Sequence, residues 1–482
     1  MQESSLSSRR KFLRTAGSLS SLLLLPNIGL SFFQNRKKPN IIFILADDLG
    51  YGEIGCYGQK DIQTPNIDRM ANEGIRFTDH YAGSTVCAPS RCSLLTGLHQ
   101  GHAYIRGNEP IDETGQVPIP ANTNTVVKYL HSAGYRTGLI GKWGLGGPGT
   151  EGEPTKQGFD YFYGYMDQRH AHNYYPEFLY RNSEVVPVEG NVVGNGRKDG
   201  TGQAIKKVNY SHDLFIKESL QFIEQNKNEP FFLYLALTIP HANNEAGVEG
   251  MEVPDLGAYA DKNWPEPEKH KAAMISRMDG DVGTLLKKLK DLNIADNTLV
   301  IFSSDNGPHK ESGIDPDFLK SSGGLRGIKR DLYEGGIRVP MIAWWPGTIK
   351  AGTTSAHISA HWDFLPTVCD LAGIDPKSET DGISYAPLLE GKKQSEHEFL
   401  YWEFVHPAKG FLQAVRIGKW KAVRYGLNSS IELYDLEQDK SEKHDVAQKW
   451  PALVARVQKL FHEARSEPSF DKWKMNSKDL NK

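Results

Sequence analysis

Residues 41–48 read IIFILADD, six apolar residues followed by two carboxylates. An apolar run of this length without polar alternation is typical of a strand that is buried on both faces of a parallel sheet. Similar runs predict strands over 135–140, 231–237 and 298–303. Helical periodicity between them predicts helices over 123–132, 214–225 and 269–292. This alternation predicts an α/β fold with a mostly parallel sheet flanked by helices.

The end of the chain has a different pattern. Short strand-like pieces separated by turn signals are followed by a helical stretch; the pieces lie at 399–404, 412–417, 420–424 and 431–434, and the helix at 451–463. Such a pattern predicts a smaller α+β domain with an antiparallel sheet. We place the boundary in the polar stretch 390–396, which gives domains over 38–390 and 391–482.

Composition excludes several classes of protein. The 482 residues carry a formal net charge of −3. The body has no run of basic residues, so a nucleic-acid partner is not expected. The four cysteines are too few for a disulfide scaffold and have no zinc-type CxxC spacing, although a single disulfide stays open.

The first 33 residues have the pattern of a targeting segment. Arg9 and Arg10 precede an uncharged stretch, 16–33, that contains four consecutive leucines. We interpret residues 1–33 as a Tat-type signal peptide, which predicts a periplasmic or secreted protein. The alternative is a transmembrane anchor, but serines, a proline and an asparagine make the stretch too polar for a stable one.

Polar side chains follow each of the four predicted strands. They are Asp47 and Asp48, Lys142, His241, and Asp305 and Asn306. In open parallel sheets, ligands bind beyond the carboxyl ends of the strands, so we expect one site there. Three carboxylates and an amide oxygen suit Ca²⁺ or Mg²⁺, whereas zinc would prefer more histidine or cysteine. The competing interpretation of Asp47 and Asp48 is turn and helix-cap chemistry.

A further polar segment, residues 87–91, reads CAPSR. Pro89 suits a first helical turn, which puts Cys87 at or just before a helix N-terminus, where an anionic ligand is favoured. Arg91 lies four residues on and therefore on the same face. Cys87 could also be a buried structural cysteine or a thiolate nucleophile of lowered pKa.

With its LLTG extension at 94–97, this segment resembles the signature of the type I formylglycine-dependent sulfatases. Further segments resemble that family's motifs in the same order: DDLGYG at 47–52, GKW at 141–143, PH at 240–241, SDNG at 304–307, GIK at 327–329 and EGGIRVP at 334–340. An ordered set is far more specific than one short string. The resemblance implies an alkaline-phosphatase-like α/β domain, a smaller C-terminal domain and hydrolysis of sulfate esters.

The resemblance also implies roles for single residues. Cys87 would be oxidised to formylglycine by a formylglycine-generating or radical-type maturase, and the hydrated aldehyde would be the nucleophile. Arg91 and Lys142 would stabilise that gem-diol. Lys329 and His241 would contact the sulfate, with His241 as proton donor to the leaving alkoxide, a poor leaving group that needs a general acid. The Ca²⁺ ligands would be Asp47, Asp48, Asp305 and Asn306. An exposed lysine and a structural histidine are the plain alternatives.

One position departs from the family. The family usually has a histidine two residues after the motif lysine, where this chain has Gly144. Another residue replaces it, with His102 and His172 as candidates, or the step is assisted differently.

The substrate is predicted from polar and aromatic segments. Residues 168–175, QRHAHNYY, combine aromatic rings with hydrogen-bonding groups, as sugar sites do. Residues 99–102 and 106–108 are similar in kind, so we expect a sulfated carbohydrate contacted by His102, Arg106, Arg169 and His172. For an exported sulfatase, we expect sugars of galactose or N-acetylgalactosamine type within that class. A polar loop with structural tyrosines is the competing interpretation. Two other functions stay open: a phosphate or phosphonate ester hydrolase of the same superfamily, and a catalytically impaired protein that binds sulfated sugars.

Overall fold

The structure is a computed structural model that describes residues 38–111, 115–194, 199–376 and 379–475. The predicted signal peptide, 1–33, lies outside the described residues. Residues Lys38–Lys482 form one compact unit. Within the described part of the chain, no helix combines the length and the apolar character that a membrane crossing requires.

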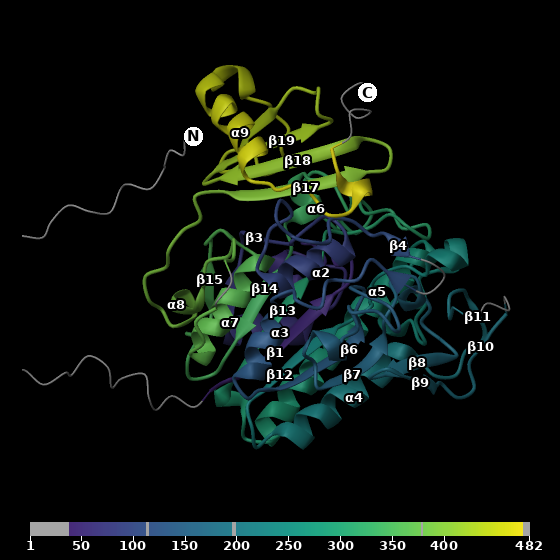
Figure 1. Ribbon diagram of the computed structural model, residues 1–482. Helices are drawn as coiled ribbons and strands as arrows, with labels where there is room; N and C mark the ends of the chain where they lie inside the picture. The colour runs from purple at the N-terminus through teal and green to yellow at the C-terminus, as the bar shows by residue number, and fades with distance from the viewer. Residues whose placement is uncertain (1–37, 112–114, 195–198, 377–378, 476–482) are drawn as a thin grey trace, which may run out of the picture. The chain divides into compact units, whose positions relative to one another are not determined.

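The fold is built on a ten-stranded sheet in the order β15-β2-β14-β13-β1-β12-β6-β7-β8-β9 (Figure 1). Its centre is formed by the four predicted strands, which pair in parallel: β1 (Asn40–Ala46), β12 (Phe231–Ala236), β13 (Thr298–Ser304) and β6 (Arg136–Lys142). The prediction of a mostly parallel central sheet is confirmed.

Both edges of the sheet carry strands that the sequence did not reveal. One edge consists of β14 (Met341–Trp344), β2 (Ile75–Phe77) and β15 (Thr353–Ser355), and the other of β7 (Tyr161–Tyr165), β8 (Phe178–Arg181) and β9 (Glu184–Pro187). Most of these strands are shorter than the central ones. The pairs β13–β14, β14–β2, β7–β8 and β8–β9 are antiparallel.

Successive residues of β1 enter two different cores. Ile42 and Ile44 contact one cluster, and Ile41 and Phe43 contact the other, as expected for a strand covered on both faces. The first face is covered by α1 (Pro65–Glu73), α4 (Ser211–Asn226) and α5 (Glu266–Asp291). The second is covered by α2 (Cys87–Thr96), α3 (Val126–Ser132) and α7 (Phe364–Ala372).

Two predicted helices differ in detail from the observed ones. Helix α3 begins at Val126 rather than at residue 123, because Thr125 is its N-cap and accepts a hydrogen bond from the backbone N–H of Lys128. Helix α5 begins at Glu266 rather than at residue 269, and it continues through Gly283. That glycine gives α1 room, since a Cβ there would lie 2.4 Å from Asn66 Oδ1.

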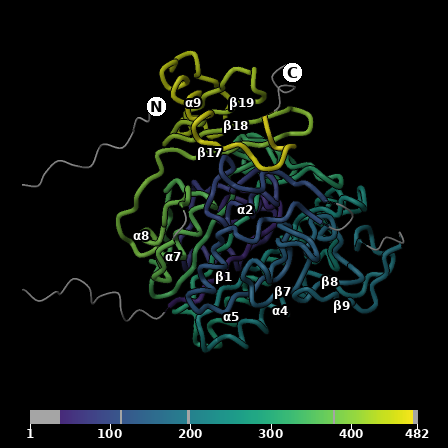
Figure 2. The backbone as a smooth tube through the Cα atoms, in the orientation of Figure 1, coloured from purple at the N-terminus to yellow at the C-terminus, as the bar shows by residue number. Residues whose placement is uncertain are grey.

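The C-terminal part has the predicted antiparallel sheet and helix. The strands are β17 (Leu400–His406), β18 (Gly410–Ile417), β19 (Trp420–Tyr425) and β20 (Glu432–Asp435), and the helix is α9 (Pro451–Glu463). One face of this sheet packs on α9. The other face contributes Trp402 to a cluster with Tyr81 and Val86, so β17 borders the region where α2 begins (Figures 1 and 2).

The remaining elements are short. Two-residue and three-residue strands pair as β3 (His80–Tyr81) with β16 (Ser359–Ala360), β4 (Pro110–Ile111) with β5 (Gly115–Gln116), and β10 (Val192–Val193) with β11 (Ala204–Lys206). Two single-turn helices are α6 (Glu334–Ile337) and α8 (Ala386–Leu389).

Candidate functional site

The carboxyl ends of the central strands bring the predicted polar residues together. Backbone hydrogen bonds hold the segments after the strands side by side, from Asp47 N to Ile239 O at 3.2 Å and from Asp305 N to Ala46 O at 3.1 Å. The nine predicted metal and catalytic residues are all buried, with at most 5% of their surface exposed. They are Asp47, Asp48, Cys87, Arg91, Lys142, His241, Asp305, Asn306 and Lys329.

Cys87 is the first residue of α2, as predicted, and it faces the carboxylate of Asp47. Its Sγ donates to Asp47 Oδ1 at 3.3 Å. Burial and then the negative charge of Asp47 raise the pKa of the Cys87 thiol well above its ordinary value. The helix N-terminus does not outweigh these effects. An unmodified Cys87 is therefore a neutral thiol, and the thiolate interpretation is not supported.

Asp47 is surrounded by cations. Lys142 Nζ donates to Asp47 Oδ2 at 2.6 Å, and the Arg91 guanidinium lies 3.5 Å from the same oxygen. Burial alone raises the pKa of Asp47, but Lys142 and Arg91 more than offset it, so the pKa is lowered. Arg91 also donates to Asp305 Oδ2 at 2.9 Å and to the Lys142 carbonyl at 2.9 Å. Arg91 and Lys142 thus lie together beside Cys87 and Asp47.

Asp48 occupies the left-handed backbone region, with φ at 65°. This conformation is uncommon outside glycine and is often found at functional sites. Its Oδ2 accepts a hydrogen bond from Lys329 Nζ at 2.8 Å, and its Oδ1 accepts one from Asn306 Nδ2 at 2.6 Å. The turn therefore directs the Asp48 carboxylate towards Lys329 and Asn306.

The donor set fits a hard divalent cation. Carboxylate oxygens of Asp47 and Asp48 lie within 4.8 Å of each other, in a group that also includes Cys87 and His241. Asp305 is adjacent, since its Oδ1 accepts a hydrogen bond from Asp48 N at 3.1 Å. Asn306 Oδ1 is buried and has no hydrogen-bond partner among the described residues, whereas the Nδ2 of the same amide is used twice. A buried acceptor without a partner is unfavourable, and a cation would satisfy it. Carboxylate and amide oxygens are the ligands that Ca²⁺ and Mg²⁺ prefer.

His241 and Lys329 form a direct pair. His241 Nδ1 donates to the Ala242 carbonyl at 2.6 Å, so its Nε2 carries the lone pair and accepts a hydrogen bond from Lys329 Nζ at 3.1 Å. Burial, followed by the positive charge of Lys329, lowers the pKa of His241 well below its ordinary value. At neutral pH the proton therefore resides on Lys329. His241 can donate a proton only after receiving one.

The four predicted substrate residues lie in different places: His172 and Arg169 near His241, and Arg106 and His102 elsewhere. The His172 ring stacks on the His241 ring with centroids 4.7 Å apart, and Arg169 lies close enough to Glu245, the partner of His172, to lower its pKa. Arg106 instead donates to Glu403 at 2.7 Å in a buried ion pair. The structure brings His172 to the site, with Arg169 near its partner Glu245, whereas Arg106 pairs with a residue of the C-terminal sheet.

His102 lies beyond the C-terminal end of α2, in a cluster with His99 and Asp381. Its Nδ1 is 2.9 Å from Asp381 Oδ1, and the two histidine rings stack with centroids 4.6 Å apart. These side chains have metal-ligand spacing, but His99 Nδ1 already accepts a hydrogen bond from Gly101 N, so its Nε2 carries the hydrogen. Hydrogen bonds within the cluster account for its arrangement, and the contacts of His102 described above are with Asp381 and His99.

The space beside Gly144 is filled by Gln168. Gly144 has φ at 79°, and a Cβ built on it would lie 1.8 Å from Gln168 Nε2. The Gln168 side chain is buried, and neither of its amide atoms has a hydrogen-bond partner among the described residues. The sequence showed only that a histidine is missing here; the contact between residues 144 and 168 depends on the tertiary fold.

Two charged residues near the site were not foreseen. Glu311 Oε2 lies 3.6 Å from Lys329 Nζ, and Glu311 Oε1 accepts a hydrogen bond from Arg330 at 2.7 Å. Burial raises the pKa of Glu311, but Lys329 and His241 reverse this and bring it to about 2. Arg330 could have been noticed as the neighbour of Lys329, whereas no motif in the sequence marks Glu311.

Comparison with known proteins agrees with this geometry. A family model described as Sulfatase matches residues 39–374, and one described as N-sulphoglucosamine sulphohydrolase, C-terminal, matches residues 328–467. Arylsulfatase A of Homo sapiens is 34% identical over 438 residues, which cover 84% of this chain and 78% of that protein. N-acetylgalactosamine-6-O-sulfatase of Bacteroides thetaiotaomicron is 30% identical over 505 residues, covering 90% and 94%. The solved structure of Ps i-CgsB in complex with k-i-k-neocarrahexaose is similar with a TM-score of 0.74 at 30% identity, covering 92% and 97%.

Proposed function

The chain belongs to the sulfatase family of sulfuric ester hydrolases, and we propose that it cleaves the sulfate ester of a sulfated carbohydrate with a formylglycine made from Cys87. The observation that carries the proposal is the position of Cys87. It begins a buried helix and lies 3.3 Å from the Asp47 carboxylate, which also pairs with Lys142 and Arg91. Oxidation at its Cβ by a formylglycine-generating or radical-type maturase would supply an aldehyde whose hydrate is a nucleophile.

The surrounding side chains would then have separate roles in catalysis. Arg91 and Lys142 hold positive charge beside residue 87, where they would stabilise an anionic oxygen. Lys329 and His241 would bind sulfate oxygens from the opposite side. The Lys329–His241 pair would also supply a proton to the leaving sugar oxygen: Lys329 is the protonated member of the pair, and His241 holds its ammonium group through the 3.1 Å contact.

Asp47, Asp48, Asp305 and Asn306 would hold Ca²⁺. When bound, the cation would polarise the sulfate group and neutralise the buried carboxylates. The orphaned oxygen of Asn306 and the hard oxygen donors support this choice.

The sugar is proposed from two sources of support. The relatives include sulfatases named for N-acetylgalactosamine, and one similar structure holds a neocarrahexaose. In this chain, His172 stacks against His241, which places a polar segment at the rim of the site. A galactose-type or N-acetylgalactosamine-type sulfate is therefore the proposed substrate, with Arg169 and His172 as contacts.

We further propose export and a two-part organisation. The paired arginines of residues 1–33 support a Tat-type signal and a periplasmic or secreted location. The division into 38–390 and 391–482 is supported by the separate four-stranded sheet, which begins at Leu400.

Mass spectrometry of the peptide containing residue 87, in protein from its native host, tests the nucleophile. The aldehyde mass is expected, together with turnover of a sulfated sugar that requires Ca²⁺ and is lost in Cys87→Ala. An unmodified thiol throughout the sample would contradict the proposal. Turnover of a phosphonate ester in preference to the sulfate ester would favour the rival hydrolase, and binding without turnover by the aldehyde form would favour the sugar-binding protein.

A further inference from the structure

A cavity of about 610 Å³ lies beside the N-terminal end of α2. Its walls come from three separate parts of the chain: Val86 and Asn108 near α2, Arg330 in the loop that carries Lys329, and Phe404, Lys472 and Trp473 from the C-terminal part. A volume of this order is within the range of small-molecule sites, which is several hundred Å³. The cavity can therefore hold a sugar unit.

The cavity adjoins the proposed reaction centre on two sides. Val86 is the N-cap residue immediately before Cys87, and Asn108 Oδ1 accepts a hydrogen bond from Ala88 N at 2.9 Å. Arg330 directly follows Lys329, whose Nζ lies 2.8 Å from Asp48 Oδ2. A leaving group attached to a sulfate at residue 87 would extend into this space.

The charges of the wall favour an anionic occupant. Two cations, Arg330 and Lys472, line the cavity with one acid, Glu109. Lys472 pairs with Glu109, whereas Arg330 donates from Nη2 to Glu311 outside the wall. The guanidinium has five N–H donors, so this contact leaves most of its capacity for a ligand. Arg330 also has φ at 77°, an unfavourable conformation that a hydrogen bond from its N–H to Thr85 O at 3.0 Å holds in place.

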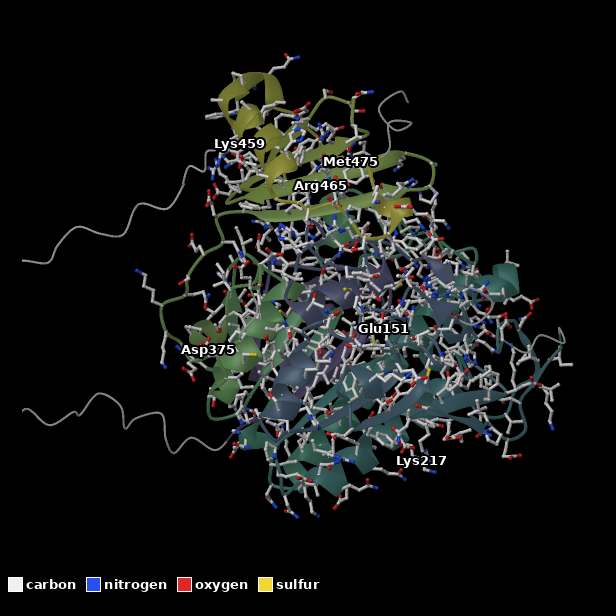
Figure 3. The ribbon with its side chains drawn as sticks, viewed as in Figure 1. Glu151, Lys217, Asp375, Lys459, Arg465 and Met475 are labelled. Carbon is white, nitrogen blue, oxygen red and sulfur yellow. The ribbon has the colours of Figure 1, made fainter. Side chains whose placement is uncertain are left out.

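The C-terminal segment after α9 closes the cavity. A Cβ on Gly107 would lie 2.7 Å from Trp473 Nε1, so the indole rests directly on that backbone. The segment is anchored by Arg465, which donates to Glu403 Oε2 at 2.8 Å, and by the Ser466 carbonyl, which accepts from Arg106 at 2.9 Å. Figure 3 shows Arg465 and Met475 where this segment runs along the C-terminal sheet. The buried Phe404 and Trp473 give the wall an apolar side, as sugar rings require.

We propose that this cavity binds the part of the sulfated substrate that extends past Val86 and Arg330, and that Arg330 pairs there with a second anionic group on the substrate. That group is a further sulfate on the same sugar or the carboxylate of an adjoining uronate. This inference rests on the proposed function, because the sulfate at residue 87 fixes which part of the substrate enters the cavity. It makes Arg330 a specificity-determining residue for doubly anionic sugars.

Binding to the full-length thiol form tests the inference without turnover. In the presence of Ca²⁺, isothermal titration compares N-acetylgalactosamine 6-sulfate, N-acetylgalactosamine 4,6-disulfate and a uronate-containing disaccharide of the 6-sulfate. At least one doubly anionic probe should bind about tenfold more tightly than the monosulfate, in line with a charge-assisted bidentate contact. Arg330→Gln should remove that advantage, so that the doubly anionic probes and the monosulfate bind with Kd values within about threefold of one another. The probe that loses affinity identifies the second anion as sulfate or carboxylate.

Arg456→Gln is the matched control, because Arg456 lies on α9 and pairs with Glu398 away from the cavity. It should leave all three affinities unchanged. Arg330→Lys, which keeps the charge but loses the bidentate fork, should retain part of the preference. The inference is overturned if the wild-type protein shows no preference, if no probe binds, or if Arg330→Gln weakens all probes equally. Failure of the proposed function would appear elsewhere, as absence of 4-nitrophenyl sulfate turnover by the aldehyde form.

Discussion

Lys329 Nζ lies 3.1 Å from His241 Nε2 and 2.8 Å from Asp48 Oδ2, so one ammonium group joins the histidine to a carboxylate of the proposed cation site. Burial opposes the charged form of Lys329, but Asp48 more than offsets this and the pKa of Lys329 is raised. The lysine is therefore charged and His241 is neutral. In this state Lys329, rather than His241, carries the proton that a leaving alkoxide would need.

Lys329→Met should therefore impair sugar sulfates more than activated esters. A sugar alkoxide needs protonation as it leaves, and loss of a general acid costs about 10²–10⁴ in rate. A nitrophenolate leaves without a proton, so 4-nitrophenyl sulfate should be affected much less. The measurement is kcat for both substrates, with formylglycine content fixed by mass spectrometry. Lys217→Met, at an exposed position on α4 (Figure 3), is the control. An equal loss for both substrates would assign Lys329 to binding alone.

Removal of the cation should lower both activity and stability. At a Ca²⁺ concentration about 100 times its Kd, binding would stabilise the folded protein by about 2.7 kcal/mol. We expect EGTA to lower Tm and abolish turnover, and Ca²⁺ to restore both better than Mg²⁺. Asn306→Ala should make Tm insensitive to Ca²⁺, because it removes the orphaned Oδ1 and the donor to Asp48. Asn428→Ala, at an exposed position, should keep the Ca²⁺ response of the wild type. A Tm that EGTA does not change would contradict the cation site.

The sequence predicted the strands and helices whose residue pattern lies within one continuous segment. The run at 41–46 is apolar because both faces of β1 are buried, and the polar residues that follow mark the strand end. The edge strands could not be recognised: β2 has three residues and β14 four, and their pairing depends on distant partners. Short strands carry too little periodicity to be separated from loops.

The same distinction applies to the site. Cys87 and the two aspartates could be identified because each lies in a compact motif, and their proximity follows from the order of parallel strands. The contacts of Gln168 and Arg106 could not be foreseen from the sequence. The neighbour of Gln168 is Gly144 and that of Arg106 is Glu403, which lies 297 positions away. Contacts of this kind follow from packing rather than from sequence spacing.

A buried carboxyl group between the two parts of the chain should make stability depend on pH. Burial raises the pKa of Glu442 to about 7; Lys421 opposes this effect, and Glu334 adds to it. Because the folded-state pKa lies above the ordinary 4.5, the stabilising contribution is complete below about pH 4.5 and is lost as pH rises through 7. Glu442→Gln is neutral throughout and should lose this slope in urea unfolding between about pH 5 and pH 8. Glu437→Gln, which is largely exposed, is the control and should keep the slope. Identical slopes in Glu442→Gln and the wild type would contradict the pKa of Glu442.

The contact between Gly144 and Gln168 gives a prediction about stability, for which Gly134 serves as the reference position. Gly134 and Gly144 have similar φ values, 82° and 79°, but a Cβ on Gly134 meets nothing within 4 Å, whereas one on Gly144 would lie 1.8 Å from Gln168 Nε2. Gly134→Ala should therefore cost only backbone strain, about 1 kcal/mol in the free energy of unfolding. Gly144→Ala adds overpacking of a buried side chain and should cost about 2–4 kcal/mol.

Gln168→Ala should relieve the extra cost, because it removes the clashing amide while leaving φ of residue 144 unchanged. In a double-mutant cycle measured by urea unfolding, Gly144→Ala and Gln168→Ala should couple by about 1–2 kcal/mol, with the double variant more stable than the sum of the single effects predicts. The Gly134→Ala and Gln168→Ala pair, which shares no contact, should be additive within about 0.5 kcal/mol. If the Gly144 pair were equally additive, the Gln168 amide could not occupy the space beside residue 144, and the place of the missing histidine would be open to another side chain such as that of His172.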